Sequence, residues 1–153
     1  KDGFDAGCVE DPRIIKMGDY FYITYACRHY EPGQYWLPME KNMHRVPERP
    51  QEFPHSLRTN WTATGLAITR DFKTYIRAGR LTNPMLDDRD VILFPEKING
   101  RFAMLHRPMS WIGKEYGTDH PAMWISFSDD LLTFSKSKLI AKAKNSKWEC
   151  KIG

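Results

Sequence analysis

Two arginines that are 18 residues apart, Arg89 and Arg107, are the first candidates for chemistry in this sequence. Between them lie the apolar runs Val91–Phe94 and Phe102–Leu105, which predict buried strands, and the pair Asn99–Gly100, which favours a hairpin turn. The outer ends of an antiparallel hairpin lie side by side, so we expect both guanidinium groups at one rim. Two planar forks of donors held there would bind an oxyanion, unless they are solvated surface arginines.

Asp11 is the second candidate, because it stands in the short run Glu10-Asp11-Pro12-Arg13. Pro12 disfavours a helical conformation at Asp11 and predicts an extended one. A neighbouring carboxylate disfavours the ionised form of an acid and a nearby guanidinium favours it, so this position suits a tunable proton donor. The alternative is a turn in which the aspartate accepts a local hydrogen bond.

The remaining pattern predicts strands and irregular loops, with no amphipathic helix of three turns. A long segment at about residues 28–61 contains five prolines and no regular period, so it is interpreted as an irregular insertion. Other strands are predicted at Ile14–Lys16, Tyr20–Ala26, Thr62–Thr69, Met123–Ser128 and Lys138–Ile140.

The chain contains an internal repeat. Thr69–Tyr75 and Ser128–Phe134 share the pattern Asp-apolar-x-Thr-aromatic, each follows a predicted strand, and each has a glycine hairpin upstream, at Gly18 and at Gly100. The repeated unit is a hairpin, a strand, a turn and a strand, which is the plan of a β-propeller blade. Two blades cannot close a ring, because propellers need about four to eight. Either this chain is part of a larger protein or partner chains complete it.

Composition fits one globular domain, with 153 residues, 41% hydrophobic and 27% charged. The net charge of +4 comes without a nucleic-acid-binding motif or a lysine block, so an anionic small substrate explains it equally well. No apolar run is long enough for a membrane span. The three cysteines lack CxxC spacing, which predicts free buried thiols rather than a disulfide framework or a zinc site.

Four motifs, taken together and in order, resemble glycoside hydrolase family 130, the β-mannoside phosphorylases and related β-mannosidases. The motifs are Glu10–Arg13, Asp88–Ile98, Leu105–Pro108 and Trp148–Gly153. The resemblance implies an all-β fold that is part, about two blades, of a five-bladed β-propeller. Residues 1–153 would then form a partial catalytic domain, with the insertion at about residues 28–61.

The resemblance also implies roles for particular residues. Asp11 would match the general acid, which passes its proton through the sugar 3-hydroxyl to the glycosidic oxygen. The residues that would hold inorganic phosphate are Arg89, Arg107 and Lys151. The residues that would line the substrate cleft are Glu10, Asp90 and His106. The chemistry is consistent, because an inverting hydrolase needs a second carboxylate to activate water, whereas phosphate is already a nucleophile that needs cationic positioning.

The expected function is therefore inverting phosphorolysis of β-mannosides to α-mannose 1-phosphate, with phosphate as co-substrate and no cofactor or metal. One alternative is a phosphate-independent β-mannosidase, with Glu10, Glu40, Glu96 or a residue outside this chain as base. Another is a non-catalytic carbohydrate-binding fragment. The expected partners are β-mannoside oligosaccharides and phosphate, not nucleic acid or a membrane, and the chain is expected to form a homo-oligomer or to belong to a longer chain. A cytoplasmic location is expected, with secretion or a periplasmic location left open.

Overall fold

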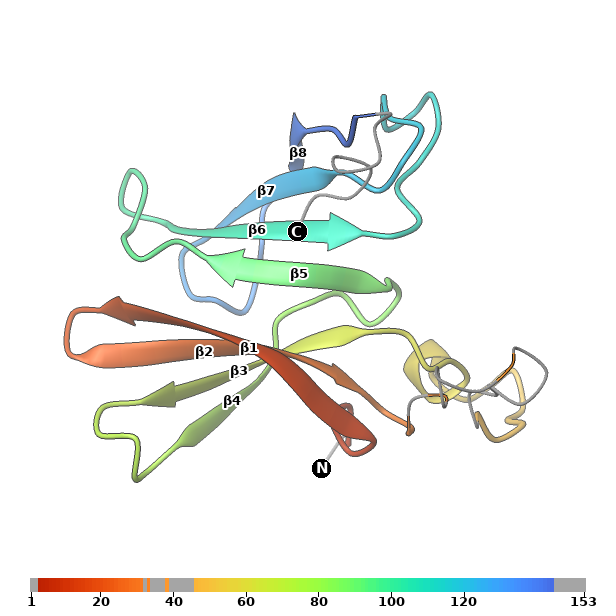
Figure 1. Cartoon of the computed structure of the whole chain (residues 1–153), viewed down its shortest axis with the longest axis horizontal. Coiled ribbons are helices and arrows are strands. Elements are labelled where there is room, and N and C mark those ends of the chain that lie inside the picture. The colour runs from red at the N-terminus through yellow and green to blue at the C-terminus, as the bar shows by residue number, and fades with distance from the viewer. Residues whose placement is uncertain (1–2, 32, 34–37, 39–45, 145–153) are drawn as a thin grey trace.

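A computed structural model describes residues 3–31, 33, 38 and 46–144, and it contains two four-stranded antiparallel sheets (Figure 1). The strands of the first sheet, in spatial order, are β1 (Cys8–Met17), β2 (Tyr20–Arg28), β3 (Ala63–Thr69) and β4 (Ile76–Arg80). Those of the second are β5 (Asp88–Leu93), β6 (Phe102–Pro108), β7 (Met123–Ser128) and β8 (Lys138–Ala141). Each sheet is a meander in which neighbours in sequence are neighbours in space, as the predicted four-stranded repeat requires.

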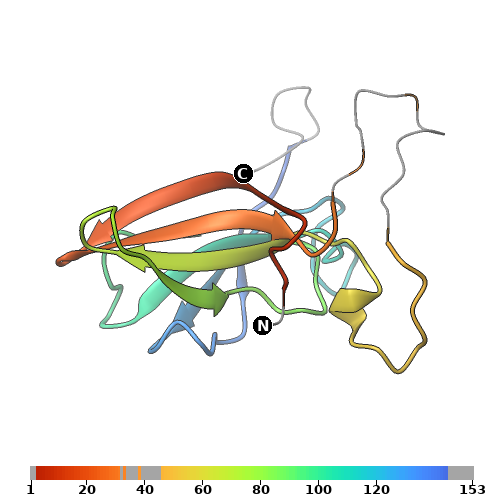
Figure 2. The same ribbon diagram turned by 90° about the horizontal axis from the view of Figure 1, so that it is seen from below.

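The segment between β2 and β3 is irregular in the residues that the structure describes. Its one regular element there is the short 3₁₀ helix η1 (His55–Leu57). This described part extends from one end of the first sheet, beyond the strands (Figures 1 and 2).

The first strand of each sheet contains a β-bulge. The β1–β2 register shifts between Glu10 and Arg13, and the β5–β6 register shifts between Arg89 and Ile92. Asp11 and Asp90 occupy these bulges with left-handed backbone angles, φ 50° and φ 53°. The extended conformation expected at Asp11 is therefore wrong, because a bulge residue leaves the ladder and aspartate tolerates the left-handed region. β1 also begins earlier than expected, at Cys8.

The repeated turn motif is confirmed by matching hydrogen bonds. The carboxylate of Asp71 accepts from the amides two and three residues further on, at 2.8 and 2.9 Å, and Asp130 does the same at 2.8 and 3.0 Å. The hydroxyls of Thr69 and Ser128 accept from the amide three residues ahead, at 3.0 and 2.9 Å. The third strand of each sheet thus turns into the fourth by one mechanism, in which side chains replace the missing backbone partners.

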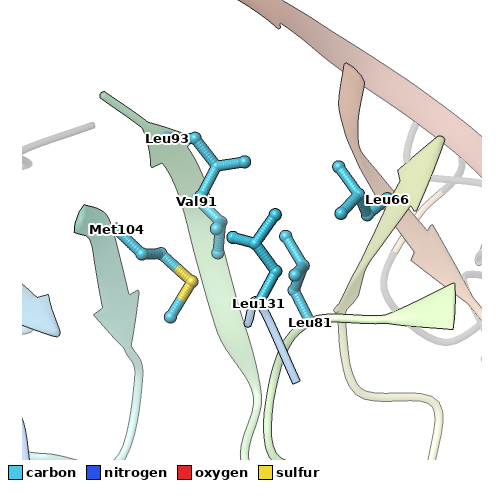
Figure 3. Packing of buried hydrophobic residues seen from close by; sticks show 6 residues of the cluster. All are labelled: Leu66, Leu81, Val91, Leu93, Met104 and Leu131. Carbon is cyan, nitrogen blue, oxygen red and sulfur yellow. The ribbon is translucent and has the colours of Figure 1, made fainter. Parts of the chain in front are cut away.

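The main core lies between the two sheets (Figure 3). Val91 and Leu93 on β5 face Leu66 on β3, and β5 lies against β2 and β3. The buried members of this cluster are Leu66, Leu81, Val91, Leu93, Met104 and Leu131. Because this core is shared between the sheets, burial of apolar surface fixes how β5 packs against β2 and β3.

A smaller cluster contains Phe4, Tyr25, Cys27 and Ala63. Burial raises the pKa of the Cys27 thiol to about 12. Cys8 and Cys27 are free thiols, and Cys27 is buried as expected, while Cys8 is half-buried. Within the described ranges, no helix has the length and apolar character needed to cross a membrane.

Candidate active site

A cavity of about 280 Å³ lies where the inner strands of the two sheets meet. β1 and β2 supply one part of its wall, and β5 and β6 supply another. The ionisable residues that line it are Glu10, Asp11, Arg13, Tyr25, Arg28, Arg89, Asp90 and Arg107. Five of the seven residues proposed from the sequence for catalysis or binding are therefore brought to one place: Glu10, Asp11, Arg89, Asp90 and Arg107.

Arg89 and Arg107 are direct partners in the β5–β6 register, as the hairpin predicts. Arg107 is buried, with a side chain that is 5% exposed, so the alternative of a solvated surface arginine is excluded for it. Its Nε donates to Asp90 Oδ2 at 3.0 Å, and its Nη2 donates to the same oxygen. Arg89 is more open and donates through Nε and Nη2 to both carboxylate oxygens of Asp87, at 2.9 and 2.7 Å.

Arg89 and Arg107 therefore each face an aspartate. The carboxylate of Asp90 also accepts from Arg13 Nη2, 3.2 Å from Oδ1, and so joins β1 to the second sheet. Asp90 is therefore placed between two guanidinium groups, one from each sheet.

Asp11 lines the same cavity from the opposite bulge. Unlike Asp90 it is exposed, and among the described residues its carboxylate has no charged partner. Tyr25 also lines the cavity, but burial raises the pKa of its hydroxyl to about 12. So high a pKa makes the hydroxyl a poor proton donor near pH 7, and its proton is already donated to Asp5 at 2.9 Å, so it is no competitor for the acid role.

His106 does not share this cavity, contrary to the expectation that it flanks the arginines in one cleft. It belongs to β6, in which neighbouring side chains point to opposite faces, and it lies on the face that carries Met104 rather than the face of Arg107. There it is buried, with Nδ1 2.8 Å from Asp88 Oδ2 and Nε2 3.0 Å from Ser137 Oγ. From the sequence, the strand was expected to end at Leu105, which left His106 in the loop beyond it. Because β6 continues to Pro108, His106 and Arg107 are strand neighbours and point to opposite faces.

Lys151, the third residue proposed for phosphate, lies outside the described residues, and its role stays a prediction. Arg13, Arg28 and Thr62 are lining residues whose roles the sequence did not reveal. Only Arg28 could have been suspected from the sequence, because it directly follows the apolar run Tyr20–Ala26 and Cys27. A charged residue that such a strand carries into the interior is rare and points to a function.

A larger cavity of about 610 Å³ lies elsewhere, next to Trp61, Arg80 and Phe134. His29 is among its lining residues, but no Asp or Glu of the described part of the chain lines it, so it lacks the carboxylic acid on which glycoside hydrolases rely. In the described part of the chain, no three His, Cys, Asp or Glu side chains are placed to hold a metal ion. The smaller cavity, where Glu10 and Asp11 of β1 lie with Arg89 of β5 and Arg107 of β6, is the candidate active site.

Comparison with known proteins supports this fold and identifies a family. The sequence model of glycoside hydrolase family 130, described as β-1,4-mannooligosaccharide phosphorylase, matches residues 1–153. The β-1,2-mannobiose phosphorylase of Listeria innocua serovar 6a is 39% identical over 126 residues, which cover 82% of this chain and 25% of that protein. The 1,2-β-oligomannan phosphorylase of Thermoanaerobacter sp. (strain X514) is 28% identical over 144 residues, which cover 92% of this chain and 34% of that protein.

A solved structure shows the same architecture. The Listeria innocua β-1,2-mannobiose phosphorylase, in complex with β-1,2-mannobiose, superposes with a TM-score of 0.62 at 23% identity, covering 95% of this chain and 31% of that chain. The two sheets are thus about two blades of a five-bladed β-propeller. The chain belongs to glycoside hydrolase family 130. It spans about a quarter to a third of the length of the relatives that it matches.

Proposed function

We propose that this chain carries part of the active site of an inverting β-mannoside phosphorylase that releases α-mannose 1-phosphate. The observation that supports it most directly is the pairing of Arg89 with Arg107 across β5 and β6, in a cavity that Asp11 also lines. Its relatives are named as phosphorylases of β-linked mannosides. Cationic positioning and a proton donor are the two functions that phosphorolysis requires of the protein.

In the proposed reaction, Asp11 gives its proton to the sugar 3-hydroxyl, which passes a proton on to the glycosidic oxygen. An oxygen of phosphate attacks the anomeric carbon from the opposite face as the bond to the leaving sugar breaks. The leaving sugar keeps the proton as a hydroxyl hydrogen, and the attack inverts the β-linkage to an α-phosphate. Arg89, Arg107 and Lys151 hold the phosphate, while Glu10 and Asp90 border the sugar.

The carboxylates beside the arginines fit this role. Before phosphate binds, Asp87 and Asp90 neutralise and orient the guanidinium groups that would otherwise repel one another. An arginine has five N–H donors, and Asp90 accepts from two nitrogens of Arg107, so the same guanidinium can contact a second anion. The two guanidinium groups would then already be ordered when phosphate binds.

Asp90 is a second candidate for the acid, because it occupies the equivalent bulge and is more enclosed than Asp11. Its side chain is 14% exposed, and it lines the same cavity. Its carboxylate accepts from Arg13 and from Arg107, so a phosphate that draws Arg107 towards itself would change the hydrogen bonds that Asp90 makes.

Phosphate-independent hydrolysis is the competing function, and it requires a carboxylate base. Of the three glutamates considered for that role, Glu10 lines the cavity, Glu96 lies on the β5–β6 hairpin away from it, and Glu40 is outside the described residues. Because Glu10 lines the cavity, the β-mannosidase alternative keeps one candidate base.

The deciding experiment measures sugar release from β-mannosides with and without phosphate, in the wild type and in Arg107→Lys. Lysine keeps the charge but loses the fork, so we expect a higher KM for phosphate and a loss of about 2–4 kcal/mol in transition-state stabilisation. Arg101→Lys, at an arginine that pairs with Asp129 on the outer part of the second sheet, is the matched control. Wild-type activity that is indifferent to phosphate would exclude phosphorolysis and favour hydrolysis.

A further inference from the structure

A buried polar network lies on the second sheet, on the face opposite the two arginines of the candidate active site. Asp88 and His106 directly precede Arg89 and Arg107 in the chain, and side chains alternate between the faces of a strand. Asp88 is 2% exposed and His106 is 4% exposed. Neither residue has a place in the phosphate and acid roles described above.

The network joins three strands through one imidazole. Nδ1 of His106, on β6, lies 2.8 Å from Oδ2 of Asp88, on β5. Its Nε2 lies 3.1 Å from Oγ of Ser126, on β7, and 3.0 Å from Oγ of Ser137, just before β8. The two serine hydroxyls are 2.7 Å apart. With a neutral imidazole, Nδ1–H donates to the carboxylate, one hydroxyl donates to the other, and that one donates to Nε2, so every hydrogen of the network has an acceptor.

A network of this kind needs a reason beyond stability. The second carboxylate oxygen of Asp88, Oδ1, is buried without a hydrogen-bond partner among the described residues, so the carboxylate depends on His106. Apolar side chains of similar volume are often as stabilising as a buried polar pair. What a buried pair can add is specificity, because it favours the one arrangement of strands in which both partners are satisfied.

The arrangement that this pair favours is the one that aligns the arginines. At this end of the hairpin, before the bulge, the β5–β6 register contains two pairs, Asp88 with Pro108 and Arg89 with Arg107. The bulge separates these two pairs from the rest of the ladder, which weakens their backbone coupling to it. Asp88 stands opposite Pro108 rather than His106, so the Asp88–His106 contact crosses the two strands diagonally and ties this short stretch together.

We propose that Asp88 and His106 are positioning residues that hold Arg89 and Arg107 in the register that phosphate requires. The inference rests on the proposed function, because that function assigns phosphate to the two arginines. Two guanidinium groups from different strands share one anion only when the strands hold them at a matching spacing, and a misplacement of about 1 Å can cost about 10²-fold in rate. The two serines extend this support to β7 and to the start of β8.

The test replaces the pair by apolar side chains in the full chain. Asp88→Leu combined with His106→Phe removes the contact without leaving a buried charge unpaired, and a cavity of about 350 Å³ that both residues line gives room for the added atoms. His106→Asn is the conservative variant, because its amide can donate to Asp88 in place of Nδ1–H.

Ser128→Ala is the matched control for a loss of stability. Ser128 is a fully buried polar residue of the same sheet, but its hydroxyl accepts from the amide of Leu131 in the turn after β7, away from the arginines. The thermal midpoint of unfolding, recorded for every variant, shows how much stability each change removes.

Two measurements report on the position of the arginines. The first is hydrogen exchange at the amide of Met109, which donates to the carbonyl oxygen of Asp87 at 2.9 Å at the arginine end of the hairpin. Its reference is the amide of Phe94, which donates to the carbonyl oxygen of Ala103 at 3.0 Å on the other side of the bulge. The second measurement is calorimetric titration of inorganic phosphate.

We expect the double variant to separate the two ends of the hairpin. Exchange at the Met109 amide should become about 10-fold faster relative to the Phe94 amide, because the arginine end opens locally. Phosphate affinity should fall about 10-fold, the loss of roughly one hydrogen bond to a charged group. His106→Asn should recover most of both effects. Ser128→Ala should lower the thermal midpoint and leave both the exchange ratio and phosphate affinity unchanged.

Two results would overturn the inference. In the first, the double variant changes the thermal midpoint but leaves the exchange ratio and phosphate affinity at their wild-type values, so that the pair is structural. In the second, Ser128→Ala weakens phosphate binding as much as the double variant does. Failure of the proposed function is a separate result, because it appears as a wild type that binds no phosphate, and the exchange ratio still decides whether Asp88 and His106 hold the arginine end of the hairpin.

Discussion

The two sheets have one backbone plan and two different electrostatic environments. Each first strand has a bulge, with Asp11 in one sheet and Asp90 in the other at nearly the same left-handed φ. Asp11 is exposed, whereas Asp90 is held between Arg13 and Arg107. The comparison shows that the repeated backbone determines where a carboxylate is presented, while its neighbours determine its charge environment.

The two bulge aspartates also differ in the charge of the residue that precedes them. Glu10 precedes Asp11 in the first sheet, and Arg89 precedes Asp90 in the second. Both pairs line one cavity, to which each blade also adds other arginines: Arg13 and Arg28 from the first and Arg107 from the second. Acids and cations therefore stand together in this cavity, as they must in a site that supplies a proton to a leaving group and holds an anionic nucleophile. The following predictions test how far the two bulges differ.

The largest expected effect is on turnover. Asp11→Asn should reduce phosphorolysis of unactivated substrates about 10²–10⁴-fold, because a general acid contributes that much, while the fold is kept. Asparagine also tolerates the left-handed backbone of the bulge. Asp90→Asn, measured beside it, is the comparison that assigns the acid. Near-normal turnover in Asp11→Asn together with a large loss in Asp90→Asn would move the acid role to the second bulge.

The next effect is on stability, and here we expect Asp90→Asn to cost more than Asp11→Asn. Asp90→Asn leaves the 5% exposed Arg107 without its counter-charge, so the free energy of unfolding should fall by about 3 kcal/mol. Asp11→Asn, at an exposed position, should change it by less than about 0.5 kcal/mol. Urea unfolding of both variants measures the difference. Equal losses would mean that the Arg107–Asp90 pair does not distinguish the two bulges.

The smallest effect is on the pH dependence of stability, and we expect it to be the same in both sheets. Hydrogen bonds from backbone amides hold the pKa values of Asp71 and Asp130 below their usual range, with the amides of Thr74 and Thr133 as the largest causes. Because the folded pKa is the lower one, each carboxylate stabilises the fold above the unfolded value of about 3.9, and this contribution is lost as pH falls through the folded pKa.

Asp71→Asn and Asp130→Asn should therefore each lower the thermal midpoint at neutral pH and make its fall below about pH 4 shallower, by similar amounts. Glu96→Gln, a charge-removing change on the exposed β5–β6 hairpin, is the control. A clear difference between the two aspartate variants would show that the repeat is equivalent in geometry but not in energy.

Much of the fold and part of the candidate site could be predicted from the sequence, because the signals for them are local. Two apolar runs and the Asn99–Gly100 turn predict the β5–β6 hairpin and with it the register that pairs Arg89 with Arg107. The repeated Asp-apolar-x-Thr-aromatic pattern determines two equivalent turns. The motifs around Asp11 and Arg107 carry the family.

Only the tertiary structure decided which charges meet. The contact between Arg13 and Asp90 spans 77 residues of sequence, and it depends on the angle at which the two sheets pack around their shared core. Arg28 and Thr62 reach the same cavity because β2 and β3 pair across the long loop, which no local pattern encodes. Local periodicity places side chains on a face of a strand, but burial between sheets determines the partners that they find there.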